Sequence, residues 1–146
     1  MSLEIPALAA LIAALVAWVA VQNHQLAREK HKLDLVEKRV AVFRAAQVLL
    51  GRVQEDGGVR KLESILEYRR DTQVAAFLFG PDVESYLAKL DQKARDLWSI
   101  HATLERLPVG DERTNQALRE NELAHDLISE LPKLKTVFGS YLHFKS

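Results

Sequence analysis

The hydrophobic positions divide the chain into one uninterrupted apolar segment and several segments with helical spacing. The apolar segment covers residues 5–21 and contains no charged, amide or hydroxyl side chain. At about 1.5 Å per residue, a helix of that length spans about 25 Å, slightly less than the roughly 30 Å hydrocarbon core of a bilayer. The pattern therefore predicts a transmembrane helix. Its expected anchor residues are Ile5, Leu8, Leu11, Leu15, Trp18 and Val21.

Beyond this segment, apolar residues recur every three or four positions, as in a helix with a buried face. A first row comprises Leu26, Leu33, Val36, Val40, Phe43 and Leu50, in phase with Ile12, Leu15 and Val19. We therefore expect one helix to continue to about Gln54 and to end at Gly57-Gly58.

The same helix carries a second apolar row, which indicates neighbours on two sides. This row comprises Leu35, Val42, Leu49 and Val53. Two interpretations remain open. Either the helix is the central helix of its own bundle, or the first row pairs with a second copy of the chain.

Glycine and proline separate the next helical segments. A short amphipathic helix is expected over residues 59–72, followed by a dense apolar patch over residues 73–81. The patch ends in Gly80-Pro81. Proline lacks an N–H and has a fixed φ, so Pro81 suits the first turn of another helix.

That helix has the most regular apolar spacing in the chain, from Val83 to Leu104. Pro108-Val109-Gly110 is expected to end it, and Asp111 to cap the last helix. Pro132 lies within the last pattern and is expected to kink the helix or to start a separate short one.

These patterns predict an all-α fold, since no segment has the period of two that a strand requires. The expected architecture is an N-terminal transmembrane helix that continues into a small antiparallel four-helix bundle. Residues 1–21 would form the N-terminal segment and transmembrane helix, and residues 22–146 the bundle.

Charges on either side of the apolar segment predict its orientation. Only Glu4 precedes the segment, whereas five basic residues follow it: Arg28, Lys30, Lys32, Lys38 and Arg39. Basic residues are retained on the cytoplasmic side, so the N-terminus is expected outside and the bundle in the cytoplasm. A cleaved signal peptide would need a positive N-terminal region, which is missing before residue 5. A buried helix of a soluble domain rarely runs this long without a polar residue.

Composition restricts the expected chemistry. The 20 basic residues balance the 20 acidic ones, so the chain has no electrostatic footprint for nucleic acid. It contains no cysteine, which removes thiol nucleophiles and thiolate metal ligands. The spacing suggests neither a Ser-His-Asp arrangement nor a glycine-rich phosphate loop. No catalytic, cofactor or metal site is therefore predicted, and the chain is not expected to be an enzyme.

The histidines are the remaining candidates for metal-binding or titrating residues. Glu122 and His125 have the Glu-x-x-His spacing of di-iron bundles, but they lie away from the apolar face, so a solvated surface is expected. His24 and His31 are expected among basic neighbours at the headgroups and water. His101 interrupts an apolar stripe and is expected to be partly buried with a hydrogen-bonding neighbour.

Two sets of residues are candidates for binding. The candidate interaction surface comprises Leu33, Val36, Val40, Phe43, Phe77 and Phe79. The candidate site for an anionic ligand comprises Arg39, Arg69 and Arg70. Nearby acidic residues are expected to neutralise these arginines along the helices, which favours a structural role for them.

The stretch Lys32-Leu33-Asp34-Leu35-x-x-Lys38-Arg39-x-x-x-Phe43, with Phe77-Leu78-Phe79-Gly80-Pro81 further on, resembles a group of short bacterial proteins with one N-terminal membrane helix. The resemblance implies this architecture and a bacterial inner membrane, and it transfers no catalytic or binding residue. We expect a membrane-anchored interaction, scaffold or accessory module that binds a protein partner or itself. The alternative is a membrane sensor that responds to an anionic cytoplasmic ligand.

Overall fold

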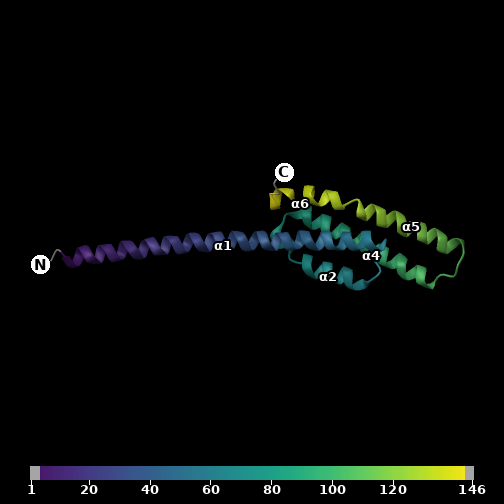
Figure 1. The fold of residues 1–146 in the computed structure, drawn as a ribbon, viewed down its shortest axis with the longest axis horizontal. Helices are drawn as coiled ribbons and strands as arrows, with labels where there is room; N and C mark the ends of the chain where they lie inside the picture. Colours follow the sequence, from purple (N-terminus) through teal and green to yellow (C-terminus); the bar gives the residue numbers. More distant parts are fainter. Residues whose placement is uncertain (1–3, 144–146) are drawn as a thin grey trace. The chain divides into compact units, whose positions relative to one another are not determined.

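The structure, a computed structural model, describes residues 4–143, and these contain helices and no strand (Figure 1). This confirms the predicted all-α class. Four helices have eleven residues or more: α1 (Glu4–Asp56), α2 (Leu62–Thr72), α4 (Pro81–Arg106) and α5 (Asp111–Ile128). The shorter elements are α3 (Ala75–Leu78), the 3₁₀ helix η1 (Leu131–Lys133) and α6 (Leu134–Leu142).

The chain divides into two compact units within α1. The N-terminal unit is Met1–Glu37, and the C-terminal unit is Lys38–Ser146. The prediction of a single helix from the apolar segment to about residue 54 is confirmed, because α1 is helical from Glu4 to Asp56. Gly57 ends it at φ 73°, a left-handed conformation that glycine adopts without strain, and its N–H donates to the Val53 carbonyl oxygen at 2.8 Å.

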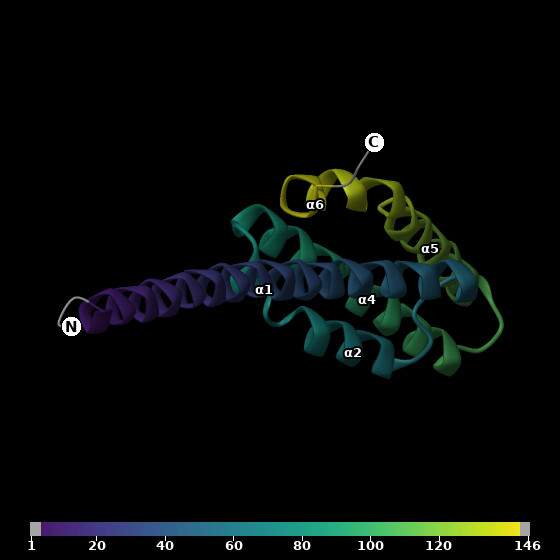
Figure 2. The ribbon, with the colours of Figure 1, turned by 60° about the vertical axis from the view of Figure 1, so that its left-hand side comes forward.

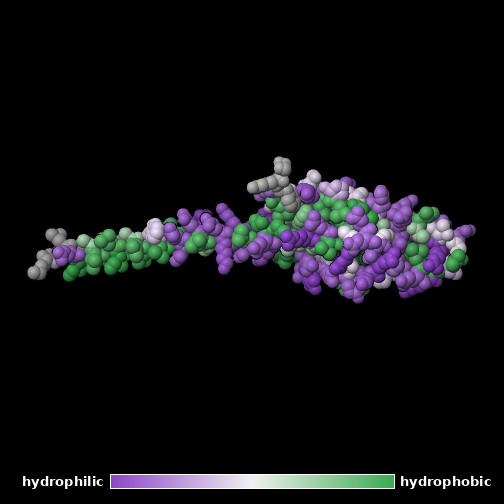
Figure 3. Space-filling view, viewed as in Figure 1, coloured by the Kyte–Doolittle hydropathy of each residue, from purple (hydrophilic) through white to green (hydrophobic). Residues whose placement is uncertain are grey.

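Residues 4–37 of the N-terminal unit form a single helical segment, and all of their side chains except the half-buried Leu35 are exposed. Its most apolar 18-residue window has a mean hydropathy of 2.2, and none of that window is buried (Figure 3). Length and composition alone fit both a membrane span and a signal sequence. The exposure does not fit a core helix, because a core helix is covered by other elements of its own chain.

The core of the C-terminal unit forms around the last four turns of α1. Residues from both predicted apolar rows are buried there, including Val42 and Phe43, so this part of the helix has neighbours on two sides as predicted. Phe138 of α6 is fully buried and meets the rings of Phe43 and Phe79 edge-on, at centroid distances of 5.4 and 5.2 Å. Edge-to-face packing adds to the burial of the rings.

Helix α4 is the main scaffold of the C-terminal unit. It packs against α5, α2, α3 and α6, and Figure 2 shows α4 and α5 following one another around a short connection. Its N-terminus is capped by a distant side chain. The Tyr141 hydroxyl accepts a hydrogen bond from the Gly80 N–H at 3.0 Å and donates one to Asp82 Oδ1 at 2.8 Å. A Cβ atom at Gly80 would lie 2.5 Å from the same hydroxyl, so a larger residue here would have to displace the Tyr141 hydroxyl.

Several predicted element boundaries shift by one to three residues. α2 begins at Leu62 rather than at residue 59, and Gly110 rather than Asp111 is the N-cap of α5. Pro132 does start a separate short element, since it lies in the first turn of η1. The apolar patch before Pro81 forms the one-turn helix α3, which the sequence pattern did not predict.

Candidate functional site

The six predicted anchor residues are all exposed on α1, with exposed fractions between 57% and 74%. Figure 3 shows a continuous hydrophobic surface over the apolar segment of the N-terminal unit. Large apolar side chains are normally buried, and a contiguous exposed patch of this kind marks a membrane or protein contact.

The predicted interaction surface separates into exposed and buried residues. Leu33 and Val36 are 62% and 45% exposed on α1, and Phe77 is 89% exposed on α3. Val40 is half-buried.

The remaining two residues of that surface require a correction. Phe43 and Phe79 are only 6% and 8% exposed, because both pack against Phe138. They therefore belong to the core rather than to an accessible surface. Leu33, Val36 and Phe77 are left as its exposed residues.

Arg39 holds together three separate parts of the C-terminal unit. Its Nε donates to the Leu78 carbonyl oxygen at 2.8 Å, and its Nη1 donates to the Tyr141 carbonyl oxygen at 3.4 Å. Its guanidinium carbon lies 5.8 Å from the Phe79 ring centroid and 5.5 Å from that of Tyr141, within range of cation–π attraction. Arg39 therefore contacts Leu78 of α3, Phe79 directly after α3, and Tyr141 of α6.

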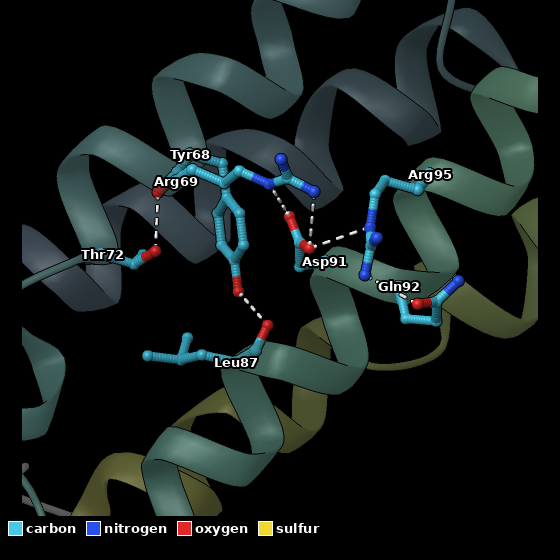
Figure 4. Close-up of polar contacts among 7 residues, drawn as sticks. All are labelled: Tyr68, Arg69, Thr72, Leu87, Asp91, Gln92 and Arg95. Carbon is cyan, nitrogen blue, oxygen red and sulfur yellow. Dashed lines mark hydrogen bonds and ion pairs between the residues drawn. The ribbon is translucent and has the colours of Figure 1, made fainter.

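Arg69 pairs with an acidic residue of another helix (Figure 4). Its Nε and Nη2 donate to the two carboxylate oxygens of Asp91 at 2.8 and 3.1 Å. Arg95 Nε approaches the same carboxylate at 3.1 Å. The hydrogen bond and the charge of Asp91 raise the pKa of Arg69 above its ordinary value. Asp91 is therefore shared by two arginines and connects α2 to α4.

The three candidate arginines have different partners and do not form one ligand site. Arg70 contacts its neighbour Asp71 at 3.2 Å and is largely exposed, whereas Arg39 and Arg69 are bound as described above. The predicted neutralisation by nearby acids occurs for Arg70, while Arg69 uses Asp91 on α4 instead. A sensor that needs these arginines free would first have to break these contacts.

Tyr68, a residue that the sequence analysis did not single out, connects α2 to α4 beside this ion pair (Figure 4). It is buried, and its hydroxyl donates to the Leu87 carbonyl oxygen at 2.7 Å. Burial, followed by the charge of Asp91, raises the pKa of Tyr68 far above its ordinary value of 10. A tyrosine embedded in an amphipathic helix gives no sequence signal of which distant carbonyl it will meet.

The raised pKa of Tyr68 predicts a stability change at alkaline pH. Below pH 10 the side chain is protonated in both the folded and unfolded states. Above pH 10 only the unfolded state releases the proton, so the free energy of unfolding should fall by about 1.4 kcal/mol per pH unit from this group. Tyr68→Phe should remove that contribution, and its lost hydrogen bond should cost about 1 kcal/mol at pH 7.

The measurement is chemical unfolding of the full-length chain in detergent, from pH 8 to 11, for both forms. Other titrating groups are common to the two proteins, so the difference between them isolates Tyr68. Equal pH slopes for the natural chain and the Tyr68→Phe variant would contradict the assignment.

A groove of about 430 Å³ runs along α1 and α2 within the C-terminal unit. Its walls include Arg44, Arg52, Glu67 and Asp71, so its basic and acidic groups balance. Arg52 donates to Glu67 Oε2 at 2.8 Å and to Ser64 Oγ at 3.3 Å. The groove therefore lacks the net positive charge that an anionic ligand would require.

The histidines have surface or structural positions. His101 is partly buried, as expected, with Nε2 3.2 Å from Glu105 and Nδ1 3.7 Å from Glu120. Glu122 and His125 are exposed on α5. Residues 4–143 contain no group of three or more side chains placed to hold a metal ion.

Comparison with known proteins gives no further assignment. No family model, curated protein or solved structure matches this chain.

Proposed function

We propose that this chain is a single-pass protein that holds a helical interaction module at the cytoplasmic face of a bacterial inner membrane. The observation that carries the proposal is the exposed apolar segment of α1, with a mean hydropathy of 2.2 and no burial in its most apolar window. A lipid environment would cover this surface, which the described part of the chain leaves open. In this proposal the C-terminal unit forms an antiparallel bundle.

The charges after the segment support the orientation. Three basic residues, Arg28, Lys30 and Lys32, are exposed on α1 shortly after the apolar segment. Basic residues that close to the end of a membrane span favour the cytoplasmic side. They also favour an uncleaved anchor over an export signal, because positive charge directly after an apolar segment opposes translocation. No loop separates anchor and module, since α1 remains helical from Glu4 to Asp56.

An interaction module is favoured over an enzyme or a ligand sensor. The candidate arginines are engaged by Asp91, Asp71 and backbone carbonyls, whereas large apolar side chains remain in contact with solvent. Phe77 is 89% exposed on α3, and Val74 beside it is 42% exposed. Together these two side chains expose adjoining apolar surface, and aromatic residues are enriched where proteins bind one another.

Cysteine labelling tests both the tether and its orientation, because the natural chain contains no cysteine. Ser99→Cys places an exposed thiol on α4, and Glu4→Cys places one before the apolar segment. In intact spheroplasts a membrane-impermeant maleimide should label the Glu4→Cys protein and not the Ser99→Cys protein. Inverted vesicles should give the opposite result.

Both proteins should sediment with membranes after alkaline carbonate extraction. Recovery of the full chain in the soluble fraction would overturn the tether. Labelling of Ser99→Cys from outside would overturn the orientation alone.

A further inference from the structure

The exposed stripe on the N-terminal unit has a seven-residue repeat. One row comprises Ile5, Ile12, Val19, Leu26 and Leu33, and a second row, three positions later, comprises Leu8, Leu15, Gln22, Glu29 and Val36. We call these ten residues the heptad seam. Residues 5–21 are all apolar, so the repeat distinguishes one side of α1 only beyond that segment, at Leu26, Leu33 and Val36. A repeat of this kind is typical of helices that pair with another helix.

The seam continues past the apolar segment into residues that lipid would not cover. Leu26 and Leu33 are 61% and 62% exposed, and Val36 is 45% exposed. They lie among charged side chains, so this part of α1 is expected in water. Apolar side chains repeated on one stripe in water are stabilised when another surface covers them.

We infer that the heptad seam binds the same seam of a second copy, forming a parallel two-stranded coiled coil next to the membrane. This inference rests on the proposed membrane tether, which makes the two helices start on the same side and run in the same direction. The water-exposed part contains fewer than three heptads, which is marginal for free helices. Confinement in one membrane raises their effective concentration.

Charges beside the seam fit this parallel, in-register arrangement. With Leu33 at position a, Lys32 is at position g and Glu37 is at position e. Position g of one helix lies beside position e of its partner five residues further on, so Lys32 meets Glu37 of the second copy, twice by symmetry. Both side chains are exposed, and neither forms an ion pair within residues 4–143.

The polar residue inside the seam also has a partner in this register. Glu29 occupies position d, and the hole that receives a d residue includes position e of the other helix. That position is Lys30 of the second copy. An opposite charge there compensates the acidic side chain, whereas a shift of the register by one heptad would remove both charge pairings.

Oxidative crosslinking of single-cysteine variants in native membranes tests the seam. Leu26→Cys, Leu33→Cys and Val36→Cys lie on the seam. The matched controls Arg28→Cys, His31→Cys and Asp34→Cys are also exposed, on other sides of α1. The three seam variants should give a disulfide-linked dimer of twice the chain mass. The three control variants should not give this product. Equal crosslinking at all six positions, no product at the seam, or a product with another chain would overturn the inference.

A charge exchange provides an independent test. Lys32→Glu alone and Glu37→Lys alone should each raise the dimer dissociation constant by about fivefold, and the double exchange should restore it. Sedimentation equilibrium of the full-length chain in detergent measures these constants. Additive weakening in the double variant would overturn the proposed register.

The same samples separate failure of the seam from failure of the tether. A protein that resists carbonate extraction but forms no seam crosslink leaves the tether standing and removes the dimer. A protein found in the soluble fraction removes the tether itself.

Discussion

Replacing Phe138 with alanine is expected to destabilise the C-terminal unit by about 3–5 kcal/mol. The Phe138 side chain is fully buried, and its ring contacts Phe43 of α1 and Phe79 next to α3. Its removal leaves a cavity where three parts of the chain meet, and these parts cannot all move inward to fill it. Because a domain of this size is stabilised by about 5–15 kcal/mol, the loss is a large fraction of the total.

The matched control is Phe77→Ala. Phe77 is 89% exposed, so the same truncation should change the free energy of unfolding by no more than about 0.5 kcal/mol. Denaturant unfolding of the full-length chain in detergent measures both variants, followed by Trp98 fluorescence in a Trp18→Phe background that removes the second tryptophan. Equal destabilisation by the two substitutions would contradict the placement of Phe138 in the core.

Introducing Leu11→Arg together with Leu15→Arg is expected to move the protein out of the membrane fraction. Each arginine near the centre of a membrane helix costs roughly 3 kcal/mol in insertion free energy, so the pair costs about 6 kcal/mol. Both leucines are more than 60% exposed on α1, and no other element of the described chain would shield the new charges. Fractionation followed by carbonate extraction measures the change.

Gln22→Arg together with Gln25→Arg is the corresponding control. It adds the same charge just after the apolar segment, where basic residues are favourable on the cytoplasmic side. This variant should remain in the membrane fraction. Loss of both variants from membranes, or retention of both, would count against a span over residues 5–21.

The chain's helix boundaries are largely predictable from sequence because local chemistry determines them. Gly57 ends α1 with a left-handed residue, and Pro81 begins α4 in a turn that needs no N–H from it. The predicted N-cap of α5, Asp111, lies one residue after the observed N-cap, Gly110, and helix ends commonly differ by one residue.

Which apolar side chains are buried could not be predicted in the same way. Phe77 and Phe79 belong to one apolar patch, yet the first is exposed and the second is buried. The difference depends on Phe138 and Tyr141, about 60 residues further along the chain, whose rings lie against Phe79. Periodicity identifies apolar positions but does not identify which distant element will cover each one.

The same limit explains the arginines. In the sequence, Arg39 lies near Asp34 and Glu37, which suggests an ion pair along the helix. In the structure its guanidinium instead binds backbone carbonyls of Leu78 and Tyr141. Backbone acceptors have no signature in the identity of the residue that carries them, so such contacts can be found only in three dimensions.

The contact between Phe43 and Phe138 has a consequence for biosynthesis. The two residues are separated by 95 positions, which a ribosome adding about 5–20 residues per second needs roughly 5–19 s to translate. The apolar segment leaves the ribosome well before Phe138 exists. During that interval the Phe43 side of the nascent helix lacks the Phe138 ring that covers it in the folded chain.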